Sequence, residues 1–142
     1  MREARRFAAL PAAALALLIG ACGSNDTTTP TTTPSGSDVP RTTETFTGTL
    51  TPRSAMWHPF TVQVAGTIDV TLTSLSPVST LTVGVGVGIT PTNGCDVQAW
   101  NNAATTGTIL TSAINPGTFC VTVYDMGSVT DAVTYTVAVT HP

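Results

Sequence analysis

The sequence predicts an all-β fold, an antiparallel β-sandwich of jelly-roll type with about eight strands. Three observations indicate this fold. Apolar and polar residues alternate over most of residues 41–142, which is typical of half-buried antiparallel strands. Short groups of Gly, Pro, Asn and Ser separate the alternating stretches. No helical periodicity occurs after the first apolar run of the chain.

The alternation is clearest in residues 68–73, 81–89 and 133–140, where every second residue is Val, Ile, Leu or Tyr. The predicted strands, in order, are 46–50, 60–64, 68–73, 81–89, 97–100, 108–114, 119–124 and 133–140. Turn signals separate them at 65–66, 76–77, 93–94, 101–102, 115–117 and 126–127. We expect residues 41–142 to form one sandwich domain, because their number suffices for one hydrophobic core and not for two.

Residues 1–21 have the regions of a secretory signal peptide. Three arginines precede an apolar run at residues 7–19, which is shorter than the roughly twenty residues that span a bilayer as a helix. The run ends in Ile19-Gly20-Ala21-Cys22, which resembles the lipobox of bacterial lipoproteins. This resemblance implies cleavage before Cys22, a diacylglyceryl group on its sulfur and a further acyl chain such as palmitate on its amine. The alternatives are an ordinary signal peptide or an N-terminal membrane anchor.

A lipidated Cys22 would hold the protein at a membrane, because two or three acyl chains together give durable anchoring. The residues after it are Gly23 and Ser24, without the aspartate that retains lipoproteins in the inner membrane. The resemblance therefore implies an extracytoplasmic location, on the outer membrane of a Gram-negative cell or on the outer face of the plasma membrane otherwise.

Residues 22–40 are predicted to be a disordered tether behind the lipidated cysteine. The segment is rich in Thr and Pro and has one large apolar residue, Val39, so it cannot bury enough surface to offset the entropy of ordering. We expect an extended spacer that lifts the domain off the membrane. The alternative is that its threonines carry O-linked glycans.

The charge balance excludes nucleic acid as a partner. The chain has no lysine, and the part that follows Ala21 keeps two arginines and seven acidic residues, a formal charge of −5. Binding to phosphates requires clustered basic side chains, which this sequence lacks.

Several segments of the domain resemble the bacterial pre-peptidase C-terminal domain, a small sandwich found beside secreted peptidases and in lipoproteins. The segments that carry the resemblance are 46–50, 58–62, 65–72, 116–125 and 133–137. It implies an accessory module and not a catalyst, and some relatives bind calcium or extracellular polymers. Because the sequence shows no peptidase domain, we do not expect a role in protease maturation.

The remaining two cysteines, Cys95 and Cys120, are predicted to form a disulfide, because two thiols in an exported domain most simply pair. The alternatives are two buried thiols or a metal pair. Two ligands do not make a zinc site.

Catalytic motifs are nearly absent, and we expect no enzyme. No serine lies in a Gly-x-Ser-x-Gly elbow. His58 is expected at the surface or edge of a strand, and His141 at a mobile chain end. A minimal hydrolase that uses His58 or the aspartates around residue 125 is the rival hypothesis.

Two groups of residues are candidates for ligand binding. Asp125 and Asp131 flank one turn and could contribute oxygens to calcium, although they more often bind turn amides. Calcium is the one cofactor candidate. Trp57 and Trp100 could stack on sugar rings if exposed, or fill the core or its rim if not. The side-chain-free file Gly84, Gly86 and Gly88 could admit a flat ligand, or pack tightly under neighbouring residues.

These observations predict a lipid-anchored, extracytoplasmic β-sandwich that acts as a non-catalytic binding or structural module at the cell envelope. Its expected partners are the membrane, through the lipid, and an envelope protein or extracellular polymer. The alternatives are a small secreted hydrolase and an accessory subunit of a larger surface complex.

Overall fold

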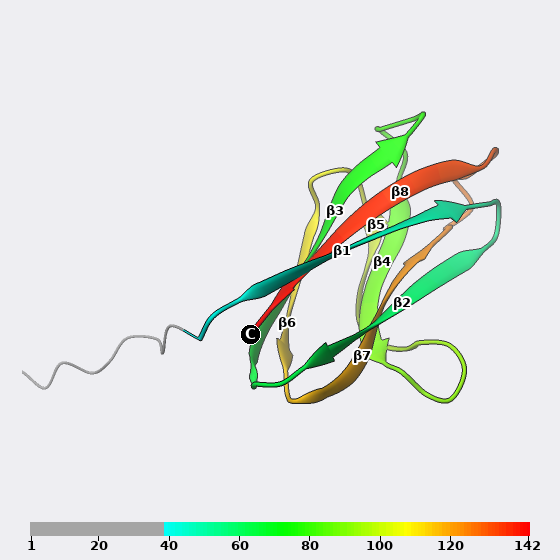
Figure 1. Cartoon of the computed structure of the whole chain (residues 1–142). Coiled ribbons are helices and arrows are strands. Elements are labelled where there is room, and N and C mark those ends of the chain that lie inside the picture. The colour runs from blue at the N-terminus through cyan, green and yellow to red at the C-terminus, as the bar shows by residue number, and fades with distance from the viewer. Residues whose placement is uncertain (1–38) are drawn as a thin grey trace, which may run out of the picture. The chain divides into compact units, whose positions relative to one another are not determined.

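The computed structural model describes residues 39–142, so the expected signal peptide, Cys22 and nearly all of the tether lie outside the described residues. The described part contains eight strands and no helix (Figure 1). The strands are β1 (Thr42–Leu50), β2 (Ala55–Val62), β3 (Gly66–Ser76), β4 (Val83–Ile89), β5 (Asp96–Ala104), β6 (Ile109–Ile114), β7 (Gly117–Tyr124) and β8 (Val133–His141). A search of residues 39–142 for a long apolar helix that could cross a membrane finds none.

The strands form two antiparallel sheets of four. The first sheet has the order β1-β8-β3-β6, and the second sheet has the order β2-β7-β4-β5. The pairs are nested along the chain, β1 with β8, β2 with β7, β3 with β6 and β4 with β5. This is the strand order of a jelly roll, so the predicted fold class is confirmed.

The core lies between the two sheets, because most apolar residues of the strands point toward the facing sheet. In β8 the inward side chains are Val133, Tyr135, Val137 and Val139, and the threonines between them point outward. β4 is buried on both faces, with valines inward and glycines outward. The largest fully buried side chains are Tyr135, Leu50, Ile68, Leu72, Val62, Val70, Val83, Val85, Val121, Val123, Val137 and Val139.

All eight predicted strands exist, and the differences lie at their ends. β2 begins at Ala55, and Val64 lies beyond it and is exposed. β3 continues past Leu72 because a register shift before Ser74 turns Leu75 back into the core. An inserted residue of this kind restores the inward phase that strict alternation loses.

Candidate ligand-binding face

The outer face of the second sheet carries both tryptophans of the chain. Trp57 lies on β2 and Trp100 on β5, the two edge strands of this sheet. Their side chains are 40% and 59% exposed, so neither tryptophan fills the core. The structure therefore places both ligand-binding candidates on the surface.

The two tryptophans belong to one row of residues that crosses the sheet. Trp57 is paired with Thr122 on β7, Thr122 with Gly86 on β4, and Gly86 with Trp100 on β5. Residues directly opposite in antiparallel strands point to the same side. Three strand spacings of about 4.8 Å put the Cα atoms of the tryptophans about 14 Å apart. We call Trp57, Thr122, Gly86 and Trp100 the tryptophan row.

The glycines of β4 leave room for neighbouring groups and not for a ligand. A Cβ at Gly84 would overlap the ring of Tyr124, and one at Gly88 would overlap the backbone of Asp96. At Gly86 it would lie 2.8 Å from Val97 Cγ1 and 3.2 Å from Thr122 Cγ2. The interpretation of a tightly packed strand is confirmed. Neighbouring residues fill the space above the β4 glycines, so no ligand can enter between the two tryptophans.

Two cross-links hold edge strand β5 to β7 over these glycines. The predicted disulfide is present: Cys95, next to β5, bonds to Cys120 of β7, with Cα atoms 5.7 Å apart. On the other side of the tryptophan row, Tyr124 Oη donates a hydrogen bond of 2.6 Å to Asn102 Oδ1. Burial of the Tyr124 phenol raises its pKa. The position of Trp100 is therefore fixed relative to β7, and through β7 relative to Trp57.

The loop that begins at Asp125 uses its carboxylate to fix the backbone. Oδ2 accepts from the Arg53 amide at 2.8 Å, and Oδ1 accepts from the amides of Gly127, Ser128 and Val129 at 2.7, 2.8 and 3.0 Å. These bonds, first the one from Arg53, hold the pKa of Asp125 below its ordinary value. Asp125 thus acts as a cap for the turn, a role in which Asp is common.

The other calcium candidate, Asp131, accepts a bond of 3.3 Å from the hydroxyl of neighbouring Thr130. Within residues 39–142, no three side chains of His, Cys, Asp or Glu gather as a metal site requires. Calcium binding stays a prediction that these contacts do not support.

His58 lies in the seam between the two sheets. Its Nε2 is 2.8 Å from Tyr135 Oη, and its ring stacks on Phe46 with a centroid distance of 5.1 Å. Burial lowers the pKa of His58 and raises the pKa of Tyr135 to about 12. The hydrogen bond thus joins β2 of the second sheet to β8 of the first. The partner of the His58 ring is the Tyr135 hydroxyl and not a serine hydroxyl, as a Ser-His hydrolase would require.

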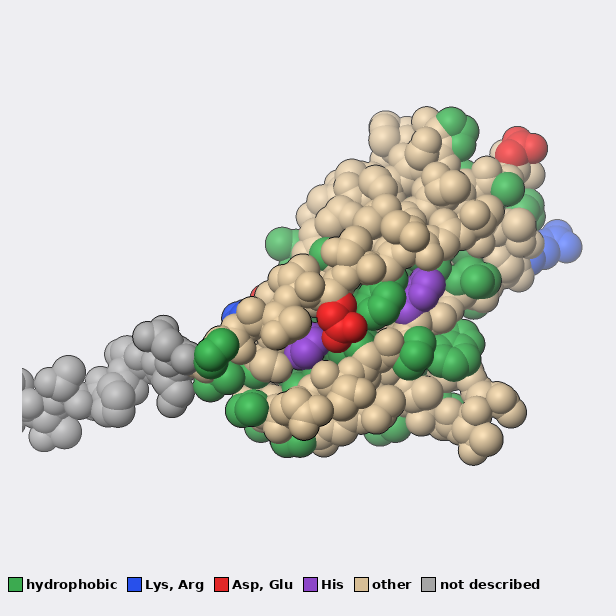
Figure 2. Space-filling model, viewed as in Figure 1, with side chains coloured by type: hydrophobic (Ala, Val, Ile, Leu, Met, Phe, Trp, Pro, Cys, Tyr) green, Lys and Arg blue, Asp and Glu red, His purple; other side chains and the backbone are tan. Residues whose placement is uncertain are grey.

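The expectation of a mobile His141 is wrong. This residue is the last of β8 and is only 4% exposed. Nε2 lies 3.0 Å from Glu44 Oε1, and Phe60 stacks on the ring at 5.6 Å. The terminal strand is held because β8 pairs with β1 and β3 on both sides. Figure 2 shows histidine side chains (purple) in a furrow among hydrophobic groups, on the side where β1 and β2 lie.

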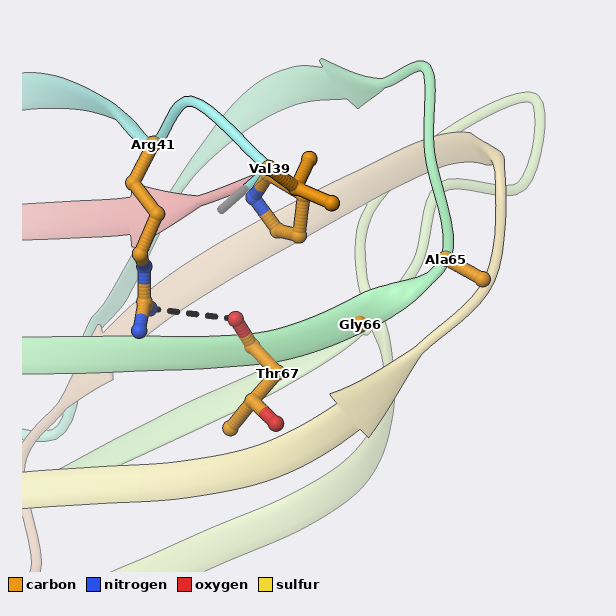
Figure 3. Close-up of a pocket in the computed structure, with 6 residues that line it drawn as sticks. Val39, Arg41, Ala65, Gly66 and Thr67 are labelled. Atoms are coloured by element: carbon orange, nitrogen blue, oxygen red, sulfur yellow. Dashed lines mark hydrogen bonds between the residues drawn. The ribbon is translucent and has the colours of Figure 1, made fainter. Parts of the chain in front are cut away.

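A hollow of ≈ 380 Å³ lies where the chain enters the domain, lined by Val39, Arg41, Ala65, Gly66, Thr67 and Pro142 (Figure 3). The Arg41 guanidinium donates to the carbonyls of Thr67 and Thr140, and it forms an ion pair of 2.8 Å with Asp69. Its donors therefore secure the start of β1 to β3 and β8, and the hollow offers a ligand little free charge.

Comparisons with known proteins do not show a family for this chain. A scan against protein-family models finds no match, and a search of curated proteins finds no relative of this chain. The resemblance to the pre-peptidase C-terminal domain stays a prediction.

Proposed function

We propose that this protein is a lipid-anchored binding module of the cell envelope, which acts by contact and not by catalysis. Cys22 carries the lipid, residues 22–40 form the spacer, and the outer face of the second sheet meets the partner. The tryptophan row is the observation on which this proposal depends.

The tryptophan row suits binding for two reasons. Trp is enriched among the residues that dominate binding energy at interfaces. The cross-links on both sides of Trp100 also hold it in place before any partner arrives. Preorganisation of this kind reduces the entropy lost on association.

The surroundings of the titratable groups argue against the hydrolase alternative. General acid–base catalysis requires a group that can reach the proton of a substrate or nucleophile. His58 is committed to Tyr135, His141 is committed to Glu44, and both carboxylate oxygens of Asp125 are bonded to backbone amides.

The test is co-sedimentation of the chain from Gly23 to Pro142, which lacks the acylated cysteine, with cell envelopes isolated from the source organism. We expect saturable binding that is lost in the double variant Trp57→Ala, Trp100→Ala. Ile109→Ala is the matched control, because Ile109 is as exposed as Trp100, at 59%, but lies on β6 of the first sheet. Equal binding by all three proteins would contradict the proposed face, and turnover of a substrate abolished by His58→Ala would favour the enzyme.

A further inference from the structure

The outer face of the second sheet is uncharged. Among β2, β7, β4 and β5, the one Asp, Glu, Lys or Arg is Asp96, which stands at the end of β5 opposite Ile89, on the inward side of the register. The outward positions around the tryptophan row hold Thr, Gly, Tyr, Asn, Val and the disulfide. A ligand on this face therefore meets aromatic rings, hydroxyls and amides.

The charges of the domain lie elsewhere and are mostly negative. Arg41 is paired with Asp69 on the first sheet, and Arg53 lies in the turn before β2. With two arginines against seven acidic residues after Ala21, the chain repels acidic polymers and has no basic patch that would attract them. The charge distribution thus favours an uncharged ligand over an anionic one.

The spacing of the tryptophans sets the size of the ligand. Three strand spacings place their Cα atoms about 14 Å apart. A single sugar ring is much shorter than this distance, whereas a chain of several sugars can stack on both indoles. The apolar C–H faces of sugar rings can stack on the flat faces of aromatic side chains. The indole ring of Trp is rigid, so it loses little conformational entropy when a sugar binds.

Asn102, next to the tryptophan row on β5, can give a sugar chain a polar contact. Thr122, between the tryptophans, is buried and its hydroxyl donates to the Met56 carbonyl at 3.0 Å, so it gives a ligand no such contact. Asn102 is exposed, and because its Oδ1 accepts the Tyr124 hydroxyl, its NH₂ group remains a donor for sugar hydroxyls.

We propose that the ligand of this face is an uncharged polysaccharide, which lies across the strands and stacks on Trp57 and Trp100. This inference rests on the proposed function, since it names the partner of the same face. The aromatic rings provide most of the affinity, and the cross-links at Cys95–Cys120 and Tyr124–Asn102 hold the rings at the spacing that the chain requires.

The test is competition for binding of the chain from Gly23 to Pro142 to isolated envelopes. The envelopes are separated into protein, uncharged polysaccharide and anionic polysaccharide, the last two by passage over an anion exchanger. We expect the uncharged fraction alone to compete, with an affinity that is unchanged when salt is raised from about 0.1 to about 1 M. Trp57→Ala and Trp100→Ala should each weaken binding of this fraction about tenfold, whereas Trp100→Phe should retain most of it.

The outcomes separate the two proposals. Competition by the protein fraction alone, or by the anionic fraction alone, would overturn the polysaccharide and leave the binding face intact. Binding of uncharged polysaccharide that is unaffected by both tryptophan variants would overturn the site. If the chain does not bind envelopes at all, the proposed function and this inference both fail. Thermal unfolding verifies that the tryptophan variants are folded, and Ile109→Ala controls for the loss of an exposed apolar side chain outside the face.

Discussion

Tyr124 and Asn102 are joined across β4 by a hydrogen bond of 2.6 Å, although β7 and β5 are not neighbours in the sheet. The bond is possible because Gly84, between them, has no side chain where the Tyr124 ring lies. Together with the disulfide at the other end of β5, it ties an edge strand that pairs with only one neighbour.

Tyr124→Phe removes this bond and keeps the ring over Gly84. We expect a loss of about 0.5–1.5 kcal/mol in the free energy of unfolding, the usual net value of one hydrogen bond, together with weaker binding to envelopes. Thr43→Val is the control, since Thr43 bonds to Thr140 at 2.8 Å in the first sheet. Denaturant unfolding and co-sedimentation measure the two effects, and equal loss of binding in both variants would contradict a positioning role for Tyr124.

Reduction of Cys95–Cys120 should destabilise the domain by about 3–4 kcal/mol, because the bond closes a loop of 25 residues. Denaturant unfolding with and without reductant gives this value. The double variant Cys95→Ala, Cys120→Ala should behave like the reduced protein. Two titratable thiols in the denatured, unreduced domain would show that the bond is absent in that preparation.

Gly88→Ala should be more destabilising than Gly94→Ala. At Gly88 an added Cβ would overlap the backbone of Asp96, which cannot move aside without displacing β5. At Gly94 there is open space, and the cost is the strain of a side chain at φ 99°, about 1 kcal/mol. We expect a loss of several kcal/mol for Gly88→Ala, as for other overpacked sites. Similar melting temperatures for the two variants would contradict the packing described for β4.

The strands were predictable because β-branched and polar residues alternate at period two, and this alternation indicates strands with one face buried. Their pairing was not, because register depends on bulges such as those after Leu72 and between Val87 and Gly88. Without the register, nothing in the sequence brings Trp57 and Trp100 into one row. For the same reason Tyr124 and Asn102 could not be recognised as partners. The glycines at 84, 86 and 88 indicated only that neighbouring residues could pack closely against β4.

The burial of His141 could not be predicted from the residues near it in the sequence. His141 looked like a free chain end, because its burial depends on Glu44 and Phe60, which are far away in sequence. Asp125 was easier to interpret, since an aspartate before Met-Gly-Ser has amides within reach of its own side chain.

The carboxylate of Asp125 should make stability fall in acid. Its pKa is lower in the folded chain than in the unfolded chain, so the unfolded chain binds the proton more readily. The stabilisation is therefore present above the ordinary value of 3.8 and is lost as the pH falls from there through the folded pKa. Asp125→Ala should lower stability at pH 7 and flatten this acid limb in pH-dependent unfolding. Asp131→Ala is the control, and an acid limb unchanged in Asp125→Ala would contradict the assignment.

The chain has two tryptophans and therefore two indole N–H signals, which report on the two ends of the proposed face separately. The most direct test is an NMR titration of the ¹⁵N-labelled chain from Gly23 to Pro142 with the uncharged polysaccharide fraction of its own envelope. We predict that both indole signals shift together and saturate at one concentration, while the backbone amide signal of Ile109 on the opposite sheet stays in place. Saturable binding that moves neither indole signal would contradict the claim that this face is the binding site.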